Sequence, residues 1–160
     1  MNRINNIREL FIDQLQDRYS AALQQAEAFE KLHAACTHSD LREVLKNDID
    51  ANKDHLQHLK TILEEFNANP EGEYCEGTAG LVKEAIDTLD IFEKGDVLDI
   101  AIAISVQHIN HHDIAGYNGC KILARYLRLT EVHKTVVEML NDEEKTDALL
   151  SGFIDRVVSE

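Results

Sequence analysis

The stretch VLDIAIAISVQHINHHDIAGYNGCKILARY, residues 97–126, decides the fold class of this 160-residue chain. It contains no proline, and its apolar side chains recur at spacings of three and four, which is the periodicity of an α-helix. Because the pattern is apolar on more than one side, we expect this helix to be the most buried one. Asp99 and several histidines interrupt the stretch, so it does not read as a membrane span.

On either side of this stretch, further segments carry helical periodicity and predict four long helices and one short one. The long patterns contain no strict heptad that persists through the connections, and tight turns join them, so antiparallel packing is the simplest arrangement. We predict an all-α protein with a single domain over residues 1–160, built as a four-helix bundle with one additional short helix. The other expected helices cover residues 4–33, 39–63, 79–93 and 130–157.

Local sequence signals mark the expected helix ends. Ser39 and Thr130 are placed as N-caps, since their hydroxyls can accept from the free N–H groups of a first helical turn. The tripeptide at residues 94–96 is typical of a helix end at Gly95 followed by a new N-cap at Asp96. Pro70 and the glycines near it predict the break between the second and third helices.

The composition limits which partners the protein can bind and indicates the cellular compartment. The chain has 30 acidic and 16 basic residues and a formal net charge of −14, which disfavours binding to nucleic acid or to anionic membranes. Its cysteines, Cys36, Cys75 and Cys120, are odd in number and widely spaced, and no signal-peptide pattern precedes the first helix. We therefore expect a soluble cytoplasmic protein with free thiols.

Polar residues that interrupt an apolar face are the candidates for function, because a buried polar group needs a partner. His108 lies about one helical turn from both His111 and His112, a spacing that can place two imidazoles on one metal ion. The alternative is that these histidines lie at the edge of the apolar stripe and bond to neighbouring helices or to water.

Two more segments interrupt apolar stripes. Glu143 and Asp147 fall in phase with apolar residues of the last helix, and two inward carboxylates repel each other unless a cation or a proton lies between them. A solvated surface run is the alternative for this pair. The stripe of the second helix has a gap at Asn52 and Lys53, which could be a polar lining, although most charges of residues 48–55 must face water.

The order of several motifs resembles the bacterial YciE/YciF-type ferritin-like family, which is often linked to stress responses. The motifs are ELFI at residues 9–12, DRYSA at 17–21, GLVKEA at 80–85, HHDIAGY at 111–117 and EEKTD at 143–147. The resemblance implies a ferritin-like bundle, a homodimer and, in many members, a carboxylate-rich metal site in the core. Such dimetal sites take one Glu from each of two helices and a Glu-x-x-His pair from each of the other two.

Against that pattern, this sequence lacks several ligands. The match places Ala22 at the first-helix Glu, Asp50 and Lys53 at the second-helix Glu-x-x-His, and Asn110 at a further Glu. Ala79 stands where the family has an acidic residue. An inward Lys53 would oppose metal binding or pair with a carboxylate, whereas a shift of register would bring Asn52 or His55 inward instead.

We therefore favour a non-catalytic structural or interaction protein with a degenerate core site and no cofactor. The alternative is a protein that binds a single divalent Fe, Mn or Zn ion, in which the residual ligands would converge on one spot. A di-iron oxidoreductase ranks last, because its ligands are missing. The candidate metal ligands are His108, His111, Asp113, Glu143 and Asp147, with Asp50 as a shorter substitute for a lost Glu.

Overall fold

The computed structural model describes residues 3–159, and within that range it consists of helices joined by short connections, without strands. This confirms the predicted all-α class with one short helix. None of the described helices combines the length and the apolarity that crossing a bilayer requires. The helices are α1 (Ile7–Ala35), α2 (Ser39–Glu65), α3 (Glu76–Ile91), α4 (Asp96–Tyr126) and α5 (Thr130–Ser159).

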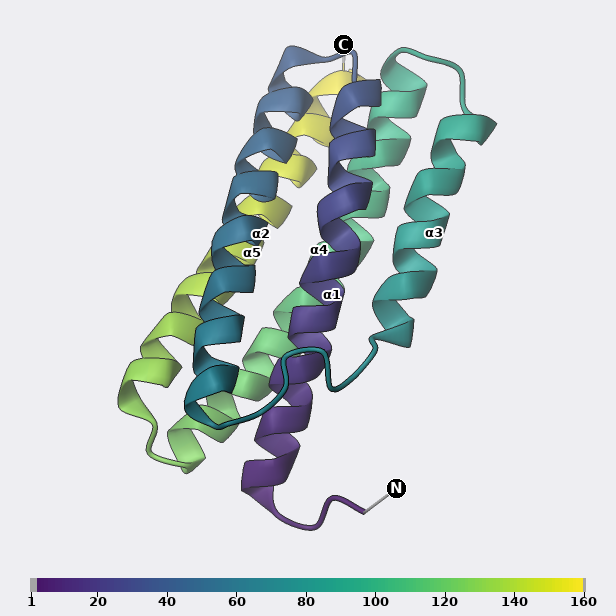
Figure 1. Ribbon diagram of the computed structural model, residues 1–160. Coiled ribbons are helices and arrows are strands. Elements are labelled where there is room, and N and C mark those ends of the chain that lie inside the picture. Colours follow the sequence, from purple (N-terminus) through teal and green to yellow (C-terminus); the bar gives the residue numbers. More distant parts are fainter. Residues whose placement is uncertain (1–2, 160) are drawn as a thin grey trace.

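Four long helices form the bundle, and α3 packs outside it against α1 and α4 (Figure 1). In the bundle, α1 and α5 run in one direction while α2 and α4 run in the other (Figure 1). This requires a crossover between α2 and α4, which the connection at residues 66–75 and α3 supply. The connection crosses over α1, where the Gln16 side-chain amide donates to the Asn69 carbonyl at 2.6 Å. Because α4 packs on α1, α3 and α5, its apolar pattern covers more than one side.

The three residues predicted as N-caps, Ser39, Asp96 and Thr130, are instead each the first residue of their helix. Ser39 is the first residue of α2, and His38 is its N-cap without a side-chain hydrogen bond. Likewise, Asp96 is the first residue of α4, and Gly95 takes the N-cap position with φ of 125°, a conformation that glycine adopts without a steric penalty. In addition, α3 begins at Glu76, three residues earlier than the apolar pattern predicts.

The core of the bundle consists of two apolar clusters with a layer of polar side chains between them. One cluster surrounds the α1–α2 connection and includes Phe29, Leu32, Leu41, Leu45, Ile102, Val106 and Phe153. The other lies toward the opposite end and includes Phe11, Leu15, Leu59, Leu63, Cys120, Met139 and Leu140. The buried polar side chains that fall between these clusters along the helices form what we call the polar layer: Arg18, Gln25, Asp48, Asn52, His55, Asn110, Asp113 and Glu143.

A fully buried carboxylate outside the polar layer holds one end of the bundle together. Asp99, in the first turn of α4, accepts hydrogen bonds from the backbone N–H groups of Thr37 and His38 at 3.0 and 2.7 Å. It also accepts from the Thr37 hydroxyl at 2.7 Å. The connection between α1 and α2 is thereby fixed to the start of α4.

We expect Asp99→Ala to lower the free energy of unfolding by about 2 to 3 kcal/mol, because it removes a charged acceptor from several donors. Asp96→Ala is the matched control, since Asp96 lies in the same first turn with an exposed side chain. Urea denaturation of the two variants measures the difference. Equal loss in both variants would contradict the role of Asp99.

Candidate functional site

The polar layer is the candidate site, because it places side chains that can titrate or bind metal in the interior of the bundle. All four bundle helices contribute to it, and every member is 6% exposed or less. Groups so far from water must be neutral or paired. The pairing within the layer therefore decides what chemistry it can support.

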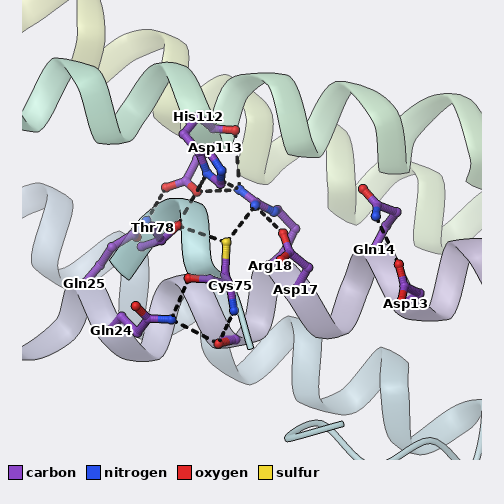
Figure 2. A network of polar contacts seen from close by, with 11 residues as sticks. Asp13, Gln14, Asp17, Arg18, Gln24, Gln25, Cys75, Thr78, His112 and Asp113 are labelled. Atoms are coloured by element: carbon purple, nitrogen blue, oxygen red, sulfur yellow. Dashed lines mark hydrogen bonds and ion pairs between the residues drawn. The ribbon is translucent and has the colours of Figure 1, made fainter. Parts of the chain in front are cut away.

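An arginine from α1 reaches across the bundle to a carboxylate on α4 (Figure 2). The Arg18 Nη1 atom lies 2.7 Å from Oδ1 of Asp113, and both side chains are almost fully buried. Gln25 donates its amide N–H to the other oxygen of Asp113 at 2.6 Å. The second guanidinium nitrogen, Nη2, pairs with Asp17. Both oxygens of Asp113 are thus held by donors of the chain itself.

A second pair joins α2 and α5. The His55 ring places Nδ1 3.3 Å from Oε1 of Glu143 and Nε2 3.1 Å from Oδ2 of Asp142. Burial works against the charged imidazole, but the adjacent carboxylates of Glu143 and Asp142 outweigh it and raise the pKa of His55. Burial raises the pKa of Glu143, while His55 and the donating Asn110 amide oppose that shift. This arrangement favours an imidazolium–carboxylate pair.

Asp48 is the third acid of the layer, and residues 3–159 place no cation beside it. Burial raises the pKa of its carboxyl group well above the ordinary value, and the nearby charges of Glu143 and Asp113 raise it further. The hydroxyl of Thr146 donates to its Oδ1 atom over 3.4 Å, which is a weak contact. Asp48 therefore keeps its proton at pH values where an exposed aspartate is ionised.

Three buried polar atoms of the layer make no hydrogen bond within the described part of the chain. They are Oδ2 of Asp48, Nδ1 of His55 and Oδ1 of Asn110. The contact of His55 Nδ1 with Glu143 is therefore an ion pair without hydrogen-bond alignment. Unpaired buried atoms are uncommon, so these three mark the part of the layer that is least satisfied by the protein.

The residues present do not fit the dimetal site of a ferritin-like bundle, which needs four glutamates and two histidines. At the corresponding positions, α2 presents Asn-x-x-His, α5 presents Glu-x-x-Thr, and the other two helices present an alanine and an asparagine. One carboxylate and one imidazole remain at these six positions. Of the other two acids of the layer, Asp113 is paired with Arg18, and burial raises the pKa of Asp48. Residues 3–159 also contain no group of three His, Cys, Asp or Glu side chains arranged to hold a metal ion. The positions are Ala22, Asn52, His55, Asn110, Glu143 and Thr146.

The candidate ligands taken from the sequence do not come together. Asp113 and Glu143 lie in the polar layer, but Asp50 and His108 are exposed. His111 is also exposed and pairs at the surface with Asp147, with 3.2 Å between Nε2 and Oδ1. The convergence that the single-metal alternative predicts for His108, His111, Asp113, Glu143 and Asp147 is therefore wrong, because α4 and α5 turn these side chains to different sides. Their role as metal ligands stays a prediction.

The family match that places Asp50 and Lys53 at the inward positions of α2 is also wrong. The shifted register, with Asn52 and His55 inward, is the one observed. Asp50 and Lys53 are exposed and lie 3.7 Å apart, while Asn52 and His55 are buried. The inner face of α2 continues from Ile49 through these two residues, so Lys53 belongs to the outer face. Lys53 pairs at the surface with Glu30 and Asp50, and not with a carboxylate of the core.

Sequence reasoning missed Arg18, which provides the buried cation of the layer. A signal for it exists, because Arg18 follows Leu15 by three residues and precedes Ala22 by four, in phase with the buried face of α1. Gly116 makes room for it on α4. A Cβ atom at position 116 would lie 2.5 Å from Arg18 Nε, closer than packed atoms come.

We expect Gly116→Ala to destabilise the protein, even though alanine favours a helix by up to about 1 kcal/mol over glycine. The new methyl group would displace a guanidinium that two carboxylates hold in place. Gly119→Ala on the same helix is the control, because a Cβ there meets nothing within 4 Å, and it should stabilise the protein. Thermal and urea denaturation measure whether the two variants change the free energy of unfolding in opposite directions.

We expect Asp48→Asn to flatten the pH dependence of stability above about pH 4. The native state holds a proton that the unfolded chain releases, so the free energy of unfolding of the wild type falls as pH rises, by up to about 1.4 kcal/mol per pH unit. The asparagine variant cannot titrate here, so its advantage over the wild type should grow with pH.

Asp50→Asn is the control on the same helix. The exposed Asp50 accepts a hydrogen bond from Lys46, which lowers its pKa, so its variant should show a small effect of opposite sign. Urea denaturation across the acidic to neutral range measures both variants. A constant difference between Asp48→Asn and the wild type would contradict a protonated Asp48.

Known proteins resemble this chain in sequence and architecture. The chain is 28% identical over 151 residues to the protein YciF of Escherichia coli strain K12, covering 94% of this chain and 91% of that one. The crystal structure of the E. coli stress protein YciF matches with a TM-score of 0.92 and 27% identity, covering 98% of this chain and 99% of that chain.

A second solved structure, YcfI from Rhodopseudomonas palustris, is provisionally described as a structural protein. It matches with a TM-score of 0.88 and 26% identity over 94% of this chain and 96% of that one. The family model described as a domain of unknown function, DUF892, matches residues 6–160. The fold is thus the ferritin-like helical bundle seen in YciF, and the chain belongs to the DUF892 family.

Proposed function

We propose that this chain is a non-catalytic structural or interaction protein, associated with stress, whose core uses its own cations in place of a metal. The observation that carries the proposal is the guanidinium of Arg18, bound to Asp113 inside the polar layer. A cation fixed among the buried carboxylates repels a divalent ion in a medium of low dielectric constant. It also uses the carboxylate that such an ion would need.

The charges of the layer balance without any added ion. Arg18 offsets Asp113, the His55 imidazolium offsets Glu143, and Asp48 is neutral through its raised pKa. Two divalent ions would bring four positive charges into this layer, against few remaining acids. Bridging carboxylates are what neutralise such ions, and neutral amides such as Asn52 and Asn110 do not replace them.

The descriptions of two relatives support the proposed association with stress and the proposed structural role. YciF of E. coli is described as a stress protein, and the R. palustris relative is provisionally described as structural. The cysteines at positions 36, 75 and 120 are free, which suits a reducing compartment such as the cytoplasm. The homodimer implied by the resemblance and the lack of nucleic-acid partners stay predictions.

A second candidate function is the binding of one divalent ion between α2 and α4. The three unpaired atoms of the layer favour it, since Asp48 Oδ2, His55 Nδ1 and Asn110 Oδ1 are a carboxyl oxygen, an imidazole nitrogen and an amide oxygen. Zinc, iron and manganese all accept such donors. Binding would have to drive the proton from Asp48 and break the pair of His55 with Glu143.

Elemental analysis of protein purified without chelators separates the two functions. We expect far less than one iron, manganese or zinc ion per chain, and no saturable uptake when the reduced protein is titrated with each ion. His55→Gln removes the candidate imidazole ligand, and His108→Gln is the control at an exposed position of α4. Stoichiometric metal that is lost in the first variant and kept in the second would contradict the proposal and support the second candidate.

A further inference from the structure

The connection that crosses α1 ends at a cysteine whose backbone is fixed on several sides. Cys75 is the N-cap of α3 and is 3% exposed. Its N–H donates to the Ser20 hydroxyl at 3.0 Å, and its carbonyl accepts from the Gln24 amide and from the N–H of Ala79, both at 3.1 Å. The Cys75 sulfur is therefore held at the positive end of a helix.

Side chains from three helices surround this sulfur (Figure 2). The Sγ atom of Cys75 lies 3.6 Å from Nη2 of Arg18 on α1 and 3.3 Å from the hydroxyl of Thr78 on α3. That hydroxyl lies 3.4 Å from Nδ1 of His112 on α4. The guanidinium of Arg18 is charged at every accessible pH, so it favours an anionic sulfur. Among the acids, Asp17 lies beside the same guanidinium and opposes that charge.

Gly77 leaves space for the ring of His112. The ring lies over the first turn of α3, where a Cβ atom at position 77 would come within 2.8 Å of Nε2 of His112. Gly77 therefore lets the imidazole approach the turn that contains Cys75. The His112 side chain is 29% exposed, so the ring connects this buried group to solvent.

The three cysteines of the chain differ in their surroundings. Burial raises the pKa of Cys36 to about 12, with Asp99 adding to the shift, and burial raises the pKa of Cys120 to about 12. Burial also works against ionisation of Cys75, but His112 and the hydroxyl and N–H of Thr78 outweigh it and lower its pKa. Only the thiolate form is a strong nucleophile.

We propose that Cys75, whose sulfur contacts the polar layer through Arg18, is an oxidation site that reacts with hydrogen peroxide. The thiolate sulfur attacks one peroxide oxygen, an S–O bond forms and the O–O bond breaks. Cysteine is oxidised by two electrons to sulfenic acid, and the peroxide is reduced to water. The proton that the thiol loses ends on the leaving hydroxide, so thiol plus peroxide gives sulfenic acid plus water.

The burial of Cys75 selects for small, uncharged oxidants. A cavity of about 510 Å³ lies beside the backbone of Cys75 and is lined in part by Tyr19, Ser20, Gln24 and Tyr74. Two of these residues, Ser20 and Gln24, are the hydrogen-bond partners of the Cys75 backbone, so the pocket borders the residues that hold Cys75 in place. Hydrogen peroxide is close to water in size, whereas a bulky thiol needs more space than a side chain that is 3% exposed allows.

The test is oxidation of the reduced full-length protein with hydrogen peroxide at neutral pH. Catalase stops the reaction, dimedone added with denaturant traps sulfenic acid, and peptide mass spectrometry reports each cysteine. We expect Cys75 to be oxidised more than about tenfold faster than Cys36 and Cys120, which are buried controls in the same molecule. A rate at Cys75 equal to or below that of the other two would overturn the proposal.

Paired variants test whether the surrounding donors cause the reactivity. Thr78→Val removes the hydroxyl beside the sulfur at constant size, and Thr88→Val removes a buried hydroxyl that bonds only to the Ala85 carbonyl of α3. We expect slower oxidation and a higher pH midpoint for Cys75 in Thr78→Val alone, with circular dichroism confirming that both variants fold. An unchanged rate and midpoint in folded Thr78→Val would overturn the assigned role of the donors.

Discussion

The guanidinium of Arg18 inside the bundle is the group on which the rest of the polar layer depends. A buried charge without a partner is strongly destabilising, so this cation requires anions close to it. Asp113 and Asp17 supply them, Gln25 completes the shell of Asp113, and Gly116 leaves the necessary space. The same guanidinium also contacts the Cys75 sulfur, so one side chain links the bundle core to the start of α3.

We expect the polar layer to give the bundle specificity more than stability. Buried ion pairs recover little of the free energy that desolvation costs, whereas the loss of one partner is severe. Helices whose only contacts were the two apolar clusters could slide or rotate with small changes in buried area. Pairing of Arg18 with Asp113 and of His55 with Glu143 fixes α1 against α4 and α2 against α5.

The fold could be predicted from the sequence because it depends on features that periodicity reports. Helix number, order and approximate bounds follow from apolar spacing and from the breaks near Pro70 and Gly95. Helix starts were less accurate, since Gly95 and His38 act as caps through their backbone conformation. A side-chain preference does not report that conformation.

The site could be predicted only in part. The sequence shows which residues could bind a metal, but it does not show which of them face the interior of the bundle. Glu143 was found because apolar neighbours define its phase. His55 and Asn52 were placed inward only by the alternative register, because Lys53 lies between them and a polar run has no phase of its own. Arg18 was missed because a charged residue is ordinarily placed on the surface, and only a partner that is distant in sequence, Asp113, makes its burial tolerable.

The pairing of Arg18 with Gly116 also restricts the order in which this sequence can change. A larger residue at 116 is tolerated only after Arg18 has been replaced, and replacing Arg18 first leaves Asp113 without its cation. Either change alone is therefore destabilising while the other position keeps its present residue. The two positions are thus coupled in evolution, and a sequence of this fold that keeps Arg18 should also keep a glycine at position 116.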